Sequence, residues 1–371
     1  MEITFWVIAP VFILAFVVTF LMTPVSMWLA RKIGAVDVPL DKRRMHQRTI
    51  PRFGGMAVFV GTMVTILLFE GGEPSITTAM VGGVLMYALG VVDDLVDVRP
   101  SIKFAAQTII AIIIYVMGIR ITFITNYFGD TDHLRFGAVA SFIITVLWIV
   151  GITNTINLID GLDGLAAGIT AISALSMAYV AYIRGSVGGM TIVCIALVAI
   201  AGSCIGFLPF NFSPAKTFLG DGGALFLGYM IAIMAVISPL RRSTVIAAVV
   251  PIVALAIPIF DTSFAIVRRI ASHRSIMSAD KEHLHHRLME SGYGQRRAVL
   301  MMYGISGIMG MAAIVLSREL YKETVVLTAI AGVYLFVFLT DPNHKIKVPN
   351  LKAINVAKKE KLEEEQAKER K

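Results

Sequence analysis

Charge is scarce in this sequence. Charged residues make up 16% of its 371 residues, and 57% of the residues are hydrophobic. Soluble globular domains carry about 25% charged residues. A disordered chain is excluded, because disorder needs few apolar residues and many charges. A soluble enzyme is disfavoured, because a soluble surface of this size would need more charge than the chain supplies. The composition therefore predicts a membrane protein.

Cysteine and internal repetition are also scarce. The two cysteines, Cys194 and Cys204, lie in one apolar segment, where a helix would place them about 15 Å apart. That separation is too large for a disulfide, so both are predicted to be core residues. We find no internal repeat, which disfavours a secondary transporter, a class often built from repeated halves with acids near the membrane midplane.

Long apolar runs dominate instead. A membrane span needs about 20 mainly apolar residues. We expect an all-α polytopic membrane protein with about eleven transmembrane helices, a membrane domain at residues 1–340 and a charged cytoplasmic tail at 341–371. Because Arg31 and Lys32 follow the first apolar run, that run is expected to remain as a span and not to be cleaved as a signal peptide. The expected spans are 3–30, 53–69, 76–92, 104–119, 137–156, 165–183, 190–210, 223–240, 244–267, 298–317 and 323–340.

The net charge of +8 has two explanations, a nucleic-acid partner or the topology of a membrane protein. With eleven spans, 26 of the 33 lysines and arginines fall on one side and 7 on the other. The positive-inside rule makes the first side cytoplasmic, which places the N-terminus outside and the C-terminus in the cytoplasm. We therefore expect a lipid bilayer and no nucleic acid as partner.

Aspartates gather at the predicted cytoplasmic ends of the spans. A charge at a span centre costs about 2.5–3.5 kcal/mol, so acids near the membrane need an explanation. Any one of them could be a helix cap, and Asp261 is explained equally well as a buried carboxylate with a polar partner. Seven aspartates at the cytoplasmic ends of the spans predict a functional site there. They are Asp93, Asp94, Asp97, Asp160, Asp163, Asp221 and Asp261.

The spacing of these acids predicts how they face one another. Asp93 and Asp97 are four residues apart and would share one face of a helix. Asn154, Asn157, Asp160 and Asp163 recur every three residues and predict a polar stripe that Gly161 and Gly164 loosen. Asp221 begins a span among glycines that would let the backbone approach phosphates.

The ligand chemistry favours a hard cation. Carboxylate and amide oxygens without a tetrahedral Cys/His pattern indicate Mg²⁺ or Mn²⁺ and not Zn²⁺. Mg²⁺ usually takes one or two protein carboxylates together with substrate phosphates. We therefore expect only some of the aspartates to bind metal.

Two basic loops accompany the acids on the same predicted side. The first spans residues 37–55 and contains His46, Arg48 and Arg52. The second spans residues 278–287 and contains His283, His285, His286 and Arg287. Cations beside carboxylates and a divalent metal suit an anionic, phosphorylated substrate. Topogenic charge explains the sign of both loops but not their histidines, for which diphosphate contact is favoured over metal ligation.

Four motifs then carry a resemblance to a known family. They are Asp93-Asp94-Leu-Val-Asp97, Asn154-Thr-Ile-Asn157-Leu-Ile-Asp160-Gly-Leu-Asp163-Gly-Leu, Gly220-Asp221-Gly-Gly and Glu282-His-Leu-His-His-Arg287. In this order they resemble the polyprenyl-phosphate N-acetylhexosamine-1-phosphate transferase superfamily, over about residues 1–340. The Asp-Asp-x-x-Asp form, with His46 and Pro51-Arg52-x-Gly-Gly, resembles the bacterial enzymes that use UDP-GlcNAc and undecaprenyl phosphate. The muramoyl-pentapeptide branch, which usually has lysine in place of Asp97 and three consecutive histidines, remains an alternative.

The resemblance implies a reaction and a set of roles. A Mg²⁺-dependent transferase in the plasma membrane would move GlcNAc-1-phosphate onto undecaprenyl phosphate at the cytoplasmic face and release UMP. The product would begin a cell-envelope glycan such as teichoic acid or lipopolysaccharide, and a homodimer is an expectation for the family. Direct attack and a phospho-aspartate intermediate both remain open. The resemblance implies metal binding for Asp221, positioning or deprotonation of the acceptor phosphate for Asp93 with support from Asp94, and proximity to nucleotide and metal for Asn157, Asp160 and Asp163. It implies stacking on uracil for Phe218 and nucleotide contact for Asn211 and Arg48, with His46 on the same loop as Arg48. It implies phosphate or sugar contact for His283, His285, His286 and Arg287.

Overall fold

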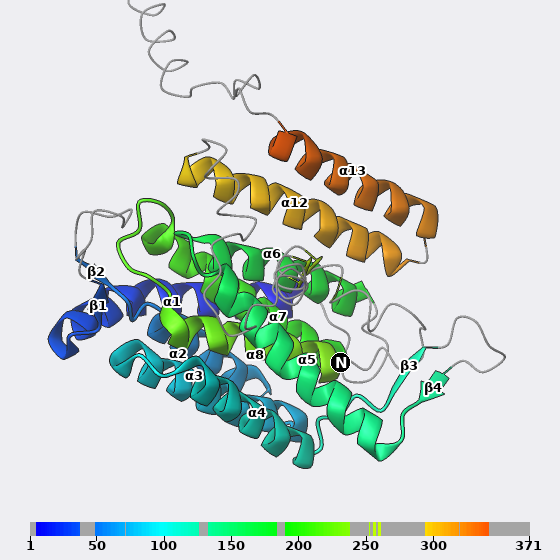
Figure 1. The fold of residues 1–371 in the computed structure, drawn as a ribbon, viewed down its shortest axis with the longest axis horizontal. Coiled ribbons are helices and arrows are strands. Elements are labelled where there is room, and N and C mark those ends of the chain that lie inside the picture. Colours follow the sequence, from blue (N-terminus) through cyan, green and yellow to red (C-terminus); the bar gives the residue numbers. More distant parts are fainter. Residues whose placement is uncertain are drawn as a thin grey trace, which may run out of the picture.

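The computed structural model describes residues 5–37, 49–70, 72–125, 133–183, 190–237, 252, 255–256, 259–260, 294–318 and 320–340. Helices dominate this part of the chain (Figure 1). They are α1 (Phe5–Ile33), α2 (Gly55–Glu70), α3 (Pro74–Val96), α4 (Pro100–Val116), α5 (Ala138–Ile159), α6 (Leu165–Ile183), α7 (Met190–Asn211), α8 (Gly220–Ile237), α12 (Gln295–Leu316) and α13 (Tyr321–Thr340).

The helices follow the apolar runs of the sequence. Ten of the eleven expected spans fall largely on described residues, and each coincides with one helix. Seven helices are long and apolar enough to cross a membrane, namely α1, α3, α5, α6, α7, α8 and α12, while α2 and α4 are shorter apolar helices. A helical protein with several candidate spans is therefore confirmed. The count of eleven stays a prediction, because the expected span at 244–267 lies almost entirely outside the described residues.

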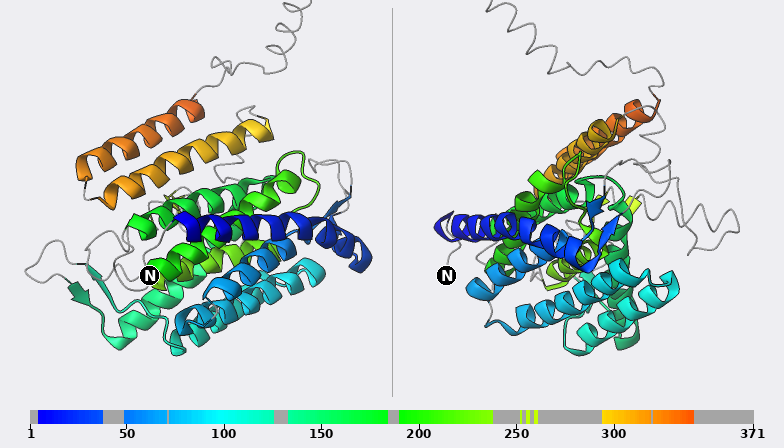
Figure 2. Two further views of the ribbon diagram at one scale, coloured as in Figure 1. Left: turned by 180° about the vertical axis from the view of Figure 1, so that it is seen from behind. Right: turned by 90° about the vertical axis from the view of Figure 1, so that its left-hand side faces the viewer.

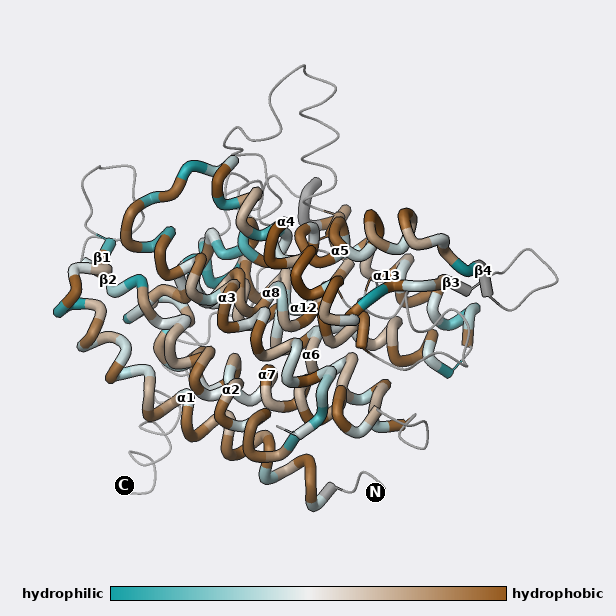
Figure 3. The backbone as a smooth tube through the Cα atoms, turned by 90° about the horizontal axis from the view of Figure 1, so that it is seen from below, coloured by the Kyte–Doolittle hydropathy of each residue, from teal (hydrophilic) through white to brown (hydrophobic). Residues whose placement is uncertain are grey.

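The helices pack in layers around α7 and α8. Helices α1, α2 and α6 pack against α7, while α3 and α5 pack against α8, and α4 covers α3 and α5. On the other side, α12 packs against α6 and α13 against α12, so this pair lies furthest from α4 (Figures 1 and 2). Figure 3 shows that the hydrophilic residues lie mainly at helix ends and in connections. Functional polar groups are thus concentrated where helices begin and end.

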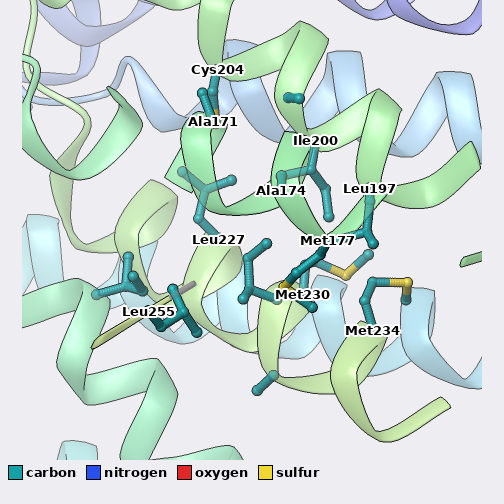
Figure 4. Close-up of a cluster of buried hydrophobic side chains, with 14 of the residues drawn as sticks. Ala171, Ala174, Met177, Leu197, Ile200, Cys204, Leu227, Met230, Met234 and Leu255 are labelled. Carbon is teal, nitrogen blue, oxygen red and sulfur yellow. The ribbon is translucent and has the colours of Figure 1, made fainter. Parts of the chain in front are cut away.

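The core lies between α6, α7 and α8. Both α7 and α8 are apolar around most of their circumference and buried along most of their length, which is the pattern of a central helix. Figure 4 shows Met177, Leu197 and Met230, one from each of these helices, in a single buried cluster. Cys194 and Cys204 are buried and free, as predicted.

Two short strand pairs were not predicted. Strand β1 (Val36–Asp37) pairs with β2 (Ile50–Pro51), and β3 (Phe123–Thr125) pairs with β4 (His133–Arg135), both antiparallel. Strands of two or three residues are too short to leave a periodic pattern in a sequence. The β1–β2 pair places Pro51 next to the segment that precedes α8, because the amide of Phe218 donates to the Pro51 carbonyl at 2.8 Å.

Candidate active site

Five helix ends meet at one end of the bundle. Helices α3, α5 and α7 finish there, and α4 and α8 begin there. Asp93 lies near the end of α3, Lys103 in the first turns of α4, Asn157 near the end of α5 and Asp221 in the first turn of α8. Residues that are far apart in the sequence therefore form one polar cluster.

Lys103 is the centre of this cluster. Its Nζ lies 2.6 Å from Asp93 Oδ2 and 2.6 Å from Asp221 Oδ1. It also donates to Asn157 Oδ1 at 3.2 Å, and Asn157 Nδ2 donates to Asp221 Oδ1. The side chain of Lys103 is 14% exposed and that of Asp93 8%, so this ion pair is shielded from solvent screening.

Sequence reasoning missed Lys103, which it counted only as a topogenic charge. A usable signal was present, because Lys103 is the single charged residue of α4. An isolated cation inside an apolar helix is costly and marks a functional or paired position. One of its partners, Asp221, is 118 residues away, a distance over which no local pattern could show the pairing.

Asp94 caps a helix to which it does not belong. Its Oδ1 accepts the amide of Asp221 and its Oδ2 the amide of Gly222, each at 3.0 Å. A carboxylate here satisfies two free amides of the α8 N-terminus and complements its dipole. We expected this backbone to be free to approach phosphates, but Asp94 already binds both amides. Gly220, at φ 74°, allows the close approach, since a Cβ there would lie 2.3 Å from the Arg52 carbonyl.

The expected shared face of Asp93 and Asp97 is wrong. Helix α3 ends at Val96, and Asp97 adopts a left-handed conformation with φ 54° while its amide donates to the Asp93 carbonyl. Asp93 is buried, and its Oδ1 accepts the amide of Val98 at 2.8 Å, whereas Asp97 is exposed. The chain turns between the two carboxylates, so they point into different surroundings.

The expected polar stripe of α5 is present only in its first half. Asn154 donates to the side chain of Gln107 on α4, and Asn157 belongs to the Lys103 cluster. Helix α5 then ends at Ile159, before Asp160. Asp163 lies in the following turn, where its Oδ2 accepts the amide of Ala215 at 3.0 Å. The two asparagines thus face α4 and α8, and Asp163 faces the segment between α7 and α8.

Asp160 lies in surroundings that carry an excess of negative charge. Burial raises the pKa of its carboxyl group well above the ordinary value, and the charges of Asp221 and Asp94 raise it further, while Arg52 opposes them. A divalent cation would relieve this excess. The described residues contain no ready-made group of three or more metal-ligating side chains. Hard oxygens supplied by one or two carboxylates nevertheless fit Mg²⁺, which usually completes its shell with substrate phosphates and water.

Asn211, the last residue of α7, and Phe218, in the connection to α8, belong to one hydrogen-bonded segment. Asn211 is buried and donates from Nδ2 to the Thr217 carbonyl at 3.0 Å. Thr217 Oγ1 donates to the Pro51 carbonyl at 3.0 Å, and the Gly54 amide donates to the Phe218 carbonyl at 3.0 Å. The Pro51-Arg-Phe-Gly54-Gly motif therefore holds in place residues 217–218, which precede Asp221 in the sequence. Asn211 contributes to these contacts through its nitrogen, and its Oδ1 has no hydrogen-bond partner among the described residues.

The remaining predicted site residues lie outside the described residues. They are His46, Arg48, Asp261, His283, His285, His286 and Arg287. Among the described ones, the structure brings together Asp93, Asp94, Asn157, Asp160 and Asp221. Asp163, Asn211 and Phe218 flank that cluster.

The fold and the site define a helical membrane protein with an anionic cluster, neutralised in part by a lysine, at one end of its bundle. The model of glycosyl transferase family 4 matches residues 76–239, which span α3 to α8. A probable undecaprenyl-phosphate N-acetylglucosaminyl 1-phosphate transferase of Bacillus subtilis (strain 168) is 41% identical over 308 residues, covering 82% of this chain and 84% of the relative. The chain belongs to glycosyl transferase family 4.

Two further relatives show the range of the similarity. A decaprenyl-phosphate N-acetylglucosaminephosphotransferase of Mycolicibacterium smegmatis is 34% identical over 326 residues, covering 81% of this chain and 79% of the relative. An undecaprenyl-phosphate alpha-N-acetylglucosaminyl 1-phosphate transferase of Thermotoga maritima is 29% identical over 311 residues, covering 82% and 89%. All three names describe the transfer of an N-acetylglucosamine phosphate to a polyprenyl phosphate.

Proposed function

We propose that this chain transfers GlcNAc-1-phosphate from UDP-GlcNAc to undecaprenyl phosphate, giving undecaprenyl-diphospho-GlcNAc and UMP. The product would be the first lipid-linked intermediate of a cell-envelope glycan. The names of the relatives support this reaction. The observation that carries it is the cluster of Asp93, Lys103, Asn157 and Asp221, which joins anion-binding and cation-binding groups at one end of a membrane bundle.

The proposed topology places this cluster at the cytoplasmic face of the plasma membrane. The membrane domain at 1–340 would contain eleven spans with the N-terminus outside, and a cytoplasmic tail at 341–371 would follow it. A homodimer stays a prediction. The first basic loop adjoins the cluster through Arg52, whose carbonyl lies against Gly220. The second basic loop, at 278–287, lies outside the described residues. A site at this face could take the nucleotide sugar from the cytoplasm and the lipid acceptor from the bilayer.

In the proposed reaction an oxygen of the acceptor phosphate attacks the sugar-bearing phosphorus of UDP-GlcNAc. The bond from that phosphorus to the bridging oxygen breaks, and UMP leaves with the electron pair. A phosphate ionised at neutral pH needs little help from a base, so holding it in line matters more than deprotonating it. A bound phosphate and Asp93 would repel each other, and the ammonium group of Lys103, 2.6 Å from Asp93 Oδ2, would offset that repulsion.

Both oxygens of Asp93 are engaged, one by the Val98 amide and the other by Lys103. This favours a positioning role for Asp93 and direct attack by the acceptor phosphate over a phospho-aspartate at this residue. Mg²⁺ or Mn²⁺, which Asp221 would hold, supplies stabilisation of the charge on the transferred phosphoryl group when bound. Lys103 and Asn157 keep the Asp221 carboxylate oriented.

A donor panel tests the proposal. Purified full-length protein with undecaprenyl phosphate and Mg²⁺ should release UMP from UDP-GlcNAc in preference to UDP-GalNAc and UDP-MurNAc-pentapeptide. Preference for UDP-MurNAc-pentapeptide would establish the muramoyl-pentapeptide alternative. Absence of UMP release, together with substrate-driven uptake into vesicles, would show a transporter instead.

A further inference from the structure

The turn that carries Asp160 and Asp163 is bound by a tyrosine from a distant helix. Tyr303 of α12 donates from its hydroxyl to the Gly164 carbonyl at 2.5 Å. The same carbonyl accepts the amide of Gly168 at 2.9 Å, in the first turn of α6. The hydroxyl therefore bonds to the residue that directly follows Asp163, across 139 residues of sequence.

Gly164 and Gly168 leave room for the side chain of Tyr303. A Cβ on Gly168 would lie 2.0 Å from Tyr303 Cζ, and a Cβ on Gly164 would lie 3.3 Å from the hydroxyl oxygen. Gly164 also adopts φ 82°, which L side chains rarely take. We expected Gly164 to loosen a polar stripe. In the structure Gly164 instead allows the left-handed conformation of the turn, and Gly168 lets the phenol ring reach it.

Helix α12 also binds the segment between α7 and α8. Arg296 donates from Nε to the Ser213 carbonyl at 2.6 Å, and the Tyr303 ring lies 6.4 Å from that of Phe212, centroid to centroid. That segment in turn donates the Ala215 amide to Asp163 Oδ2. One helix thus contacts both segments that flank the carboxylate cluster.

We propose that Tyr303 is a positioning residue for the turn that carries Asp160 and Asp163, the two aspartates that the family resemblance puts near the nucleotide. Its hydroxyl fixes the turn at 160–164, and through that turn Asp160 and Asp163, without touching substrate. Helices α12 and α6 also contact each other through buried apolar side chains, so we expect them to stay packed when the hydroxyl alone is removed. The inference rests on the proposed function for the identity of the donor.

Tyr303→Phe is the direct test, because it keeps the ring and removes only the hydroxyl. We expect the KM for UDP-GlcNAc to rise roughly 3- to 10-fold, the range that follows from losing one neutral hydrogen bond. The KM for undecaprenyl phosphate should stay unchanged, and the thermal unfolding midpoint should fall only slightly, because the Gly164 carbonyl keeps the Gly168 amide as a partner. Hydrogen exchange of the amides at 160–168 should become faster. Gly168→Ala, which displaces the ring, should raise the same KM further.

Tyr115→Phe is the matched control. The Tyr115 hydroxyl also donates to a backbone carbonyl across two helices, that of Ala138 at 3.3 Å, but away from the cluster. It should change neither the KM nor exchange at 160–168. Equal changes in both KM values for Tyr303→Phe, or a wild-type KM, would overturn the inference. If wild-type protein releases no UMP from UDP-GlcNAc, the proposed function fails, and unchanged exchange at 160–168 in Tyr303→Phe would still refute the positioning role.

Discussion

At the scale of single residues, the three aspartates of one short motif have three different tasks. Asp93 is paired with Lys103, Asp94 caps α8 and Asp97 ends α3 with an exposed side chain. A shared motif therefore does not mean a shared chemistry. The consequences of substituting each residue should differ accordingly.

Asp97→Asn should retain most of the UMP-releasing activity, whereas Asp93→Asn should lose nearly all of it. Asparagine tolerates the left-handed conformation that Asp97 adopts, so the cap is preserved. Asparagine at 93 leaves the buried ammonium of Lys103 with less negative charge. Steady-state UMP release for both variants decides the point. Equal losses of activity in the two variants would show that Asp97 is needed for turnover as much as Asp93, although its side chain is exposed.

Lys103→Met should lose at least about 100-fold in turnover and should lower the unfolding midpoint. Removing one member of a buried ion pair typically costs about 3–5 kcal/mol, because the remaining charge has no partner. Here two carboxylates, Asp93 and Asp221, would be left facing each other. Thermal unfolding and UMP release measure the two effects.

Added Mg²⁺ distinguishes the electrostatic explanation from a packing defect. If like-charge repulsion destabilises Lys103→Met, millimolar Mg²⁺ should raise its unfolding midpoint by more than it raises that of wild type. An equal response of both proteins to Mg²⁺ would contradict this explanation, since methionine fills nearly the same space as the lysine stem.

At the scale of helices, positions were predictable from the sequence, but their ends were not. Apolar runs located the helices because burial in lipid or protein depends on composition summed over about 20 residues. The ends of α3 and α5 fall at single residues, Asp97 and Asp160, which leave the helical conformation, so composition averaged over a whole apolar run does not locate them. Lys103 and Tyr303 escaped notice for a related reason, because each binds a residue more than 100 positions away, Asp221 and Gly164 respectively.

Asp94→Ala tests whether a side chain of α3 stabilises the N-terminus of α8. Loss of an N-cap typically costs about 0.5–2 kcal/mol, and here two α8 amides would lose their acceptor. We expect faster hydrogen exchange at 221–223, a modest drop in unfolding midpoint and a large loss of turnover, because the backbone that carries Asp221 would lose this support and only the contacts of its carboxylate with Lys103 and Asn157 would remain. Unchanged exchange at these amides would show that water replaces Asp94 and that its importance lies elsewhere.

At the scale of the whole molecule, the orientation of the bundle decides which compartment supplies the nucleotide sugar. Three helices, α5, α6 and α7, separate Gly137 from Lys216. If all three cross the membrane, these two positions lie on opposite sides. Lys216 lies at the end that carries the carboxylate cluster, so its side of the membrane is that of the site.

Cysteine labelling can read this orientation directly. Cys194 and Cys204 are buried, so wild-type protein should give little background with a membrane-impermeant maleimide. Gly137 and Lys216 are exposed, and a Cβ on Gly137 meets nothing within 4 Å. Lys216→Cys should react only in inverted vesicles and Gly137→Cys only in intact cells. The reverse pattern would place the site outside, where the proposed nucleotide-sugar donor is not supplied. Labelling of both positions from one side would mean that α5, α6 and α7 do not all cross, and the charge bias of 26 to 7 would then need a different explanation.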